Sequence, residues 1–79
     1  MSYSTLVETL VKGVVEDPSA VEIEETVEGH TRTFFVRVAD NDIGKVIGKS
    51  GRVVSAIRSV VSAVASRDRE RAFVKILPE

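Results

Sequence analysis

Ile43-Gly-Lys-Val-Ile-Gly-Lys-Ser-Gly-Arg-Val-Val-Ser-Ala-Ile-Arg58 is the stretch that organises the rest of this chain. Its aliphatic spacing predicts a short helix that ends at Gly48, a polar tip at Lys49 and Ser50, and a second amphipathic helix from about Gly51. Because glycine has no Cβ, the backbone can bend sharply there and a ligand can approach it closely. Unpaired amides at the start of the second helix favour an anion. With lysines and aliphatic surface around it, that anion is best interpreted as a nucleic-acid backbone.

The length and composition limit what else the chain can be. Its 79 residues leave room for one domain, residues 1–79, whose core would supply only about 3 to 5 kcal/mol unless it is helped by association. No cysteine is present, so neither a disulfide nor a cysteine zinc site can stabilise it. No apolar run is long enough to span a membrane, and no signal-peptide core follows Met1. We expect a cytoplasmic protein without a membrane partner.

Charge is distributed unevenly along the chain although its net value is only −1. Residues 1–42 carry three basic against nine acidic residues, a net −6, whereas residues 43–79 carry eight against three, a net +5. Such asymmetry indicates a basic surface for an acidic partner. The alternative is that these charges simply lie on solvated faces.

The pattern of apolar residues predicts an α+β fold in the order helix, strand, strand, helix, helix, strand, with three helices covering one face of a three-stranded sheet. The first strand is expected to have one buried and one acidic side, and Gly29-His30 to form a two-residue hairpin turn. Asp40-Asn41-Asp42 is expected to cap the short central helix. The expected elements span residues 3–15, 21–28, 31–38, 43–47, 51–66 and 72–77.

The residues from Val46 to Val54 resemble the KH-domain signature: an aliphatic pair, a Gly-x-x-Gly loop, and a further aliphatic residue beyond it. Over nearly its full length the chain is similar to the small bacterial single-KH proteins of the KH-domain protein A family. The resemblance implies the type II KH arrangement and a loop that clamps about four nucleotides of single-stranded RNA. It also implies a homodimer, or a heterodimer with a larger KH-containing protein, and post-transcriptional regulation linked to cell growth and division.

The expected RNA site has three parts. The loop backbone approaches the phosphates, with Lys49 supplying charge and Ser50 a hydroxyl, while Lys45 and Arg52 extend a basic rim. Apolar neighbours shape the groove, some as its floor and some as core. The aromatic candidates for base stacking are Phe35 and Phe73. The complete expected site is Gly44, Lys45, Ile47, Gly48, Lys49, Ser50, Gly51, Arg52, Val54 and Ile57.

Other chemistry fits the sequence less well. Gly44 to Ser50 is one residue short of a nucleotide-binding P-loop, and no strand leads directly into it. With no cysteine and only His30 as histidine, the chain has no nucleophile–base pair, and no metal or cofactor is expected. It is therefore predicted not to be an enzyme. The open alternative is a KH-shaped protein-interaction or dimerisation module with little RNA binding of its own.

Overall fold

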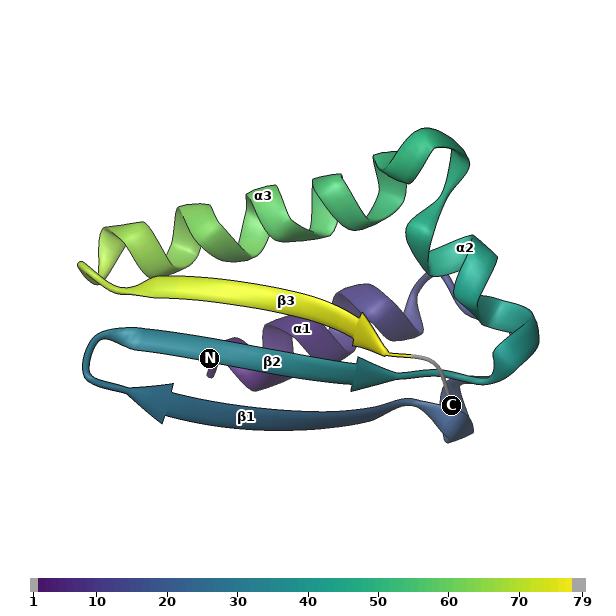
Figure 1. Cartoon of the computed structure of the whole chain (residues 1–79), viewed down its shortest axis with the longest axis horizontal. Helices are drawn as coiled ribbons and strands as arrows, with labels where there is room; N and C mark the ends of the chain where they lie inside the picture. The colour runs from purple at the N-terminus through teal and green to yellow at the C-terminus, as the bar shows by residue number, and fades with distance from the viewer. Residues whose placement is uncertain (1, 78–79) are drawn as a thin grey trace.

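The computed structural model describes residues 2–77, and they fold in the predicted order of helix, two strands, two helices and strand (Figure 1). The α+β class is confirmed. The regular elements are α1 (Tyr3–Lys12), β1 (Glu22–Glu28), β2 (Thr31–Arg37), α2 (Ile43–Ile47), α3 (Arg52–Arg67) and β3 (Arg71–Leu77). Within this part of the chain, every helix is too short or too polar to cross a membrane.

The sheet has the strand order β1-β2-β3, so β2 is central and both outer strands are edge strands. β1 and β2 form an antiparallel hairpin in which Glu28 pairs with Thr31. That register leaves Gly29 and His30 as the predicted two-residue turn, and Gly29 has the positive φ, +61°, for which such turns use glycine. β3 pairs with the other side of β2 in parallel.

One face of the sheet carries the core, because successive strand residues point to opposite faces. Phe34 and Val36 of β2 are completely buried there, and Val74 of β3 is 2% exposed. Figure 1 shows α1 behind the sheet, α3 running beside β3, and α2 near the ends of β2 and β3 where the arrows point. The helices add Val7, Val11, Val46, Ile57, Val61 and Ala65 to this core.

α1 is shorter than the apolar spacing predicts. It ends at Lys12, where Gly13 forms the C-cap, and the N–H of Val14 then closes a tighter turn on the carbonyl of Val11 at 3.1 Å. Glycine is a weak helix former, so the helix stops although apolar residues continue. Val15 still packs against the core. Beyond Lys12 the apolar pattern therefore does not mark helix, and of its two residues there Val15 contacts the core while Val14 is exposed.

β1 lacks the buried side that its alternation predicts. Ile23 is half-buried, but Val27 is 58% exposed. Glu25 shares their face and forms an ion pair with Arg32 at 2.8 Å. The edge position of β1 leaves both of its faces largely solvated.

On the face of the sheet away from the helices, acidic residues from the first half of the chain lie apart from basic residues of the second half. Arg71 and Lys75 lie on β3, whereas the acidic residues lie on β1, at the opposite edge. The Nζ of Lys75 lies 5.8 Å from the ring centroid of Phe35 on the neighbouring strand, which is close enough for a cation–π contact. The acidic residues on this face of β1 are Glu22, Glu24 and Glu28.

Candidate nucleic-acid interface

The connection between α2 and α3 is a tight turn that requires glycine at its first position. Gly48 has φ +77° and ψ 170°, a conformation open essentially to glycine alone. A Cβ on Gly48 would lie 2.4 Å from Cγ2 of Val53 and 2.8 Å from its backbone nitrogen. The loop is therefore folded back against the first turn of α3. The predicted helix end at Gly48 is confirmed.

Two further residues of this loop have left-handed backbones. Ser50 has φ +56° and Gly51 has φ +73°, inside the short 3-10 turn Lys49–Gly51 that precedes α3. A left-handed conformation costs a residue with a Cβ roughly 1 to 2 kcal/mol, and such strain is commonest where backbone shape serves a function. Among the described residues no side chain caps the first turn of α3. Its amide end is therefore left to solvent or to an anion.

Cationic side chains surround this loop. Lys49 and Ser50 are exposed at the tip, and Arg52 is exposed at the first position of α3. Neither Lys49 nor Arg52 forms an ion pair with another residue between 2 and 77. Both charges are therefore available to a phosphate.

Lys45 behaves differently from the other two predicted cations. Its Nζ lies 3.5 Å from Oε1 of Glu16 and 3.9 Å from Oδ1 of Asp42. Side-chain exposure is 44% for Lys45 and 72% for Glu16, so the contact is open to water. The lysine belongs to the rim, but two carboxylates compete with any phosphate for it.

The side chain of Asp42 does not cap α2 as expected. It instead joins the residues that precede α2 to the segment that follows α1. Its side chain is completely buried and makes no capping hydrogen bond to α2. Instead its two oxygens accept the N–H groups of Glu16 at 3.1 Å and Asp17 at 3.0 Å. These two backbone hydrogen bonds lower the pKa of Asp42 despite its burial. The sequence could not show a contact across about 25 residues.

Some apolar members of the expected site lie at the surface, and others are buried beneath it. Gly44 is exposed, and a Cβ added to it would meet nothing within 4 Å. Ile47 is half-buried, whereas Val54 and Ile57 are each only 5% exposed. Val54 and Ile57 therefore support the site from beneath, and only Gly44 and Ile47 offer surface.

A groove between α3 and β3 starts at Arg58, seven residues after Gly51, and apart from Phe73 its lining was not part of the predicted site. The Nε of Arg58 on α3 donates to the carbonyl of Val74 on β3 at 3.0 Å, which fixes the spacing of the two elements. The cavity beside this contact has a volume of about 340 Å³ and is lined by Arg58, Ser62, Ala72, Phe73, Val74 and Lys75. Arg58, Ser62 and Ser66 recur every four residues, and this polar stripe was a signal in the sequence that could have indicated the groove.

A second groove, almost wholly apolar, lies between α1 and α3. Val14 and Val60 are 37% and 44% exposed there. Its volume is about 320 Å³, and its lining is Leu10, Val14, Arg52, Val53, Ala56, Ile57 and Val60. Exposed aliphatic residues gathered in this way are typical of a protein–protein contact.

Metal chemistry has no basis in the described residues. Between residues 2 and 77 no three carboxylate, histidine or cysteine side chains are grouped so that they could hold a metal ion. His30 is exposed in the hairpin turn, as predicted. The loop, its free cations and the polar groove are instead suited to holding a chain of phosphates and bases.

Comparison with known proteins identifies the family. The model of the KhpA/KhpB KH domain matches residues 4–76. The RNA-binding protein KhpA of Caldanaerobacter subterraneus subsp. tengcongensis is 44% identical over 73 residues, which cover 91% of this chain and 96% of that protein. The RNA-binding protein KhpA of Chlamydia pneumoniae is 41% identical, covering 89% and 90% of the two chains.

The fold has a relative among solved structures. The crystal structure of Aquifex aeolicus Era Y63A bound to GDP.AlF4− matches with a TM-score of 0.69 at 12% identity, covering 96% of this chain and 29% of Era. At that identity the likeness concerns the fold alone. The expectation that the chain is not an enzyme agrees with relatives named for RNA binding. The predicted resemblance is confirmed, and the chain belongs to the KhpA/KhpB KH-domain family.

Proposed function

We propose that this chain is a non-catalytic, single-stranded RNA-binding protein that grips the RNA backbone with its Gly48–Gly51 loop. The observation that carries the proposal is the loop geometry: positive φ values at Gly48, Ser50 and Gly51 beside the uncapped start of α3. The relatives named RNA-binding protein KhpA support it.

In this mechanism the loop and the helix start hold phosphates. The backbone at Gly48 and Gly51 approaches the RNA, Lys49 and Arg52 supply charge, and the Ser50 hydroxyl donates to a phosphate oxygen. Gly44 and Ile47 form the adjoining surface, and Lys45 extends the rim when it leaves its acidic partners. The bound RNA strand then follows the groove between α3 and β3. About four nucleotides held in this way give modest affinity and little sequence preference.

A double substitution in the loop tests the proposal. Lys49→Asp with Ser50→Asp places two carboxylates opposite phosphate, so RNA binding measured by fluorescence anisotropy should be lost. Position 50 tolerates aspartate better than most residues, because aspartate is enriched among left-handed residues. Circular dichroism should show that the fold is retained. A folded double variant that binds RNA like the parent would show that the loop is not the site.

Salt dependence gives a second measurement. Lys49→Ala should lower the slope of log affinity against log salt by about 0.7 if the lysine neutralises one phosphate of a single strand. Lys12→Ala on α1 is the matched control, since Lys12 is an exposed lysine paired with Glu8. Single-stranded RNA should compete better than a duplex of equal length. Equal competition by both would indicate a nonspecific basic patch.

We also propose that the chain pairs with a second copy, or with a larger KH-containing protein, through the apolar groove between α1 and α3. The exposed Val14 and Val60 support this, because aliphatic surface of this kind gains free energy when covered. Pairing would raise RNA affinity through avidity. In the cell, the combination suits a post-transcriptional regulator or RNA chaperone linked to growth and division, which sequencing of crosslinked RNA would test.

A further inference from the structure

The face of the sheet turned away from the helices is covered by no other element of residues 2–77. In Figure 1, α1 lies behind the sheet, on the opposite side from this open face. A sheet face of this kind is often simply solvated. Here, however, the side chains on the open face form an ordered pattern of charge.

The strand register groups these side chains into rows that run across the sheet from β1 through β2 to β3. Two rows begin with a carboxylate on β1 and end with a cation on β3, and they are Glu24, Phe35 and Lys75, and Glu28, Thr31 and Arg71. Negative charge therefore lies along one edge of the open face and positive charge along the other.

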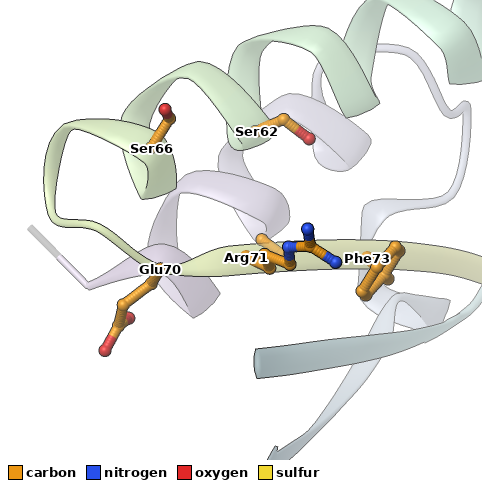
Figure 2. Close-up of a pocket in the computed structure, with 6 residues that line it drawn as sticks. Ser62, Ser66, Glu70, Arg71 and Phe73 are labelled. Carbon is orange, nitrogen blue, oxygen red and sulfur yellow. The ribbon is translucent and has the colours of Figure 1, made fainter. Parts of the chain in front are cut away.

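The charges at the ends of the two rows are available to a partner. All four side chains belong to exposed residues, and none forms an ion pair with another residue between 2 and 77. Figure 2 shows the guanidinium of Arg71 lying along β3, whereas Glu70 points away from it. Glu70 is paired instead with Arg32, whose Nε lies 2.7 Å from its Oε2.

An aromatic ring lies between these charged edges. Phe35 is half-buried on the central strand β2, and a hollow of about 220 Å³ lies beside it. The hollow is lined by Glu22, Ile23, Glu24, Phe35 and Arg37. Covering the ring with apolar surface would gain free energy, and the hollow leaves room for a side chain from a partner.

A two-fold axis parallel to β2 would bring two copies of this face together with opposite charges in contact. Since β1 and β3 lie on opposite sides of β2, that rotation places β1 of one copy over β3 of the other. Glu24 then faces Lys75 of the second copy, and Phe35 lies near its own counterpart. Glu28 likewise faces Arg71. Stacked sheets keep their strand directions within about 30° of each other, so the charged edges still overlie.

The other way to stack two copies brings like charges together. An axis that runs across the strands places β1 over β1 and β3 over β3, so that carboxylates face carboxylates and cations face cations. In the parallel arrangement like charges meet only at Arg37, which faces its own counterpart and has Glu22 beside it on β1. Charge therefore selects the axis parallel to β2.

We infer that the open sheet face is a weak, self-complementary contact between two copies of the chain, in which the acidic β1 of each copy lies on the basic β3 of the other. Three strands of seven residues measure about 24 Å by 10 Å, so the contact buries less than about 1,200 Å², the range of transient interfaces. We expect a dissociation constant near about 1 mM.

This contact goes beyond the proposed function and does not depend on RNA binding. It lies on a different side of the molecule from the apolar groove between α1 and α3, so a chain that uses both surfaces can join more than two copies. Lys75 also lines the groove between α3 and β3, so the contact is best tested without RNA.

The test is a dilution series of the isotope-labelled chain at low salt, followed by NMR. All chains carry Val60→Lys, which blocks the apolar groove and leaves the sheet face as the surface for pairing. Concentration-dependent shifts should fall on the three strands. Glu24→Lys and Lys75→Glu should each weaken pairing about 2- to 30-fold, because each ion pair occurs twice in the contact. An equimolar mixture of the two variants should restore pairing, since the new lysine of one faces the new glutamate of the other.

Glu8→Lys and Lys12→Glu are the matched control, because they make the same charge changes at an exposed ion pair on α1. Alone or mixed, they should pair like the Val60→Lys chain, and circular dichroism should show that every variant is folded. Salt at about 1 M, where charges are screened beyond about 3 Å, should weaken the contact.

Three results would overturn the contact and leave the proposed RNA binding standing. The first is a Val60→Lys chain whose spectrum does not change with concentration. The second is a mixture of the Glu24→Lys and Lys75→Glu variants that pairs no better than either variant alone. The third is an equal change of pairing in the control variants, which would show that net charge alone is responsible.

Discussion

At the scale of single residues, the surroundings of Lys45 set how much of the basic rim is free to bind RNA. Its ammonium group lies within 4 Å of the carboxylates of both Glu16 and Asp42. Glu16 is the exposed partner, so it can be changed without touching the buried hydrogen bonds of Asp42. The carboxylate of Glu16 therefore competes with RNA phosphate for Lys45.

Replacing Glu16 by glutamine should raise RNA affinity about two- to five-fold, since exposed ion pairs are worth up to about 1 kcal/mol. The salt slope should become steeper, because Lys45 then neutralises a phosphate. Glu8→Gln makes the same change of charge at the pair with Lys12, which lies on α1. An equal gain in both variants, measured by anisotropy, would mean that only net charge matters.

The three glycines of the site should differ sharply when each is replaced by alanine. Gly48→Ala should lower the free energy of unfolding by about 2 kcal/mol or more, because its Cβ meets Val53 and its φ is +77°. Gly51→Ala should cost about 1 kcal/mol for its left-handed backbone alone. Gly44→Ala lies in a helix with open space, so it should be neutral or stabilising by up to about 1 kcal/mol. Urea unfolding measures all three, and equal costs would contradict the loop geometry.

At the scale of elements, a polar cluster joins α1, β2 and the turn after α3. The hydroxyl of Tyr3 donates to Asp68, and the guanidinium of Arg32 lies 5.1 Å from the centroid of the Tyr3 ring. Arg32 also pairs with Glu25 and Glu70, at 2.8 Å and 2.7 Å. Asp68 and Glu70, in the charged run after α3, therefore contact α1 and β2. These contacts hold together the end of the fold that lies opposite the loop.

Stability should fall in alkaline solution because of this cluster. The hydrogen bond to Asp68 raises the pKa of Tyr3 from 10.0 to about 12. A group whose folded pKa is raised contributes stability below its unfolded pKa and loses it as pH rises through the folded value. The contribution of Tyr3 should therefore disappear between pH 10 and about 12. Thermal unfolding of the parent should show this fall, and Tyr3→Phe should be less stable at neutral pH but show a smaller fall. Identical alkaline profiles would argue against the hydrogen bond.

The difference between local and distant contacts explains what the sequence could predict. The loop was predictable because Gly48, Gly51 and the aliphatic residues around them act within one short stretch. The helix end at Gly13 was missed because apolar spacing reports burial, which continues to Val15 after the helix stops. The role of Asp42 was missed because its partners lie about 25 residues away.

The groove between α3 and β3 also depends on contacts between residues that are distant in sequence. Its two sides come from α3 and β3. The sequence contains the polar stripe of Arg58, Ser62 and Ser66 and the candidate Phe73, but it does not show that they face one another. That β3 lies beside α3 depends on its parallel pairing with β2, which no local pattern specifies.

At the scale of the whole molecule, acidic residues gather on β1 and basic residues on β3, the loop and α3. The apolar groove between α1 and α3 adds a third kind of surface. One small domain thus presents a basic, an acidic and an apolar region, which suits binding RNA and a protein partner at the same time.

Val60→Lys should abolish self-association while the fold is retained, because Val60 is 44% exposed and a charge in the apolar groove cannot be covered. Ser59→Lys is the matched control, since it adds the same charge at an exposed position of α3 outside that groove. Sedimentation at micromolar concentration should show the parent and the control associated and Val60→Lys monomeric. A parent that is monomeric at high concentration and captures no KH partner would contradict pairing.

The parallel pairing of β3 with β2 also bears on the order of folding. β1 and β2 meet across a two-residue turn, whereas Thr31 of β2 pairs with Arg71, forty residues later. Closing so long a loop costs entropy, so we expect β3 to join last and to detach first. That strand carries one lip of the groove, so bound RNA should slow hydrogen exchange at β3 more than in the β1–β2 hairpin. The strand that folds last would then be the one that the ligand holds in place.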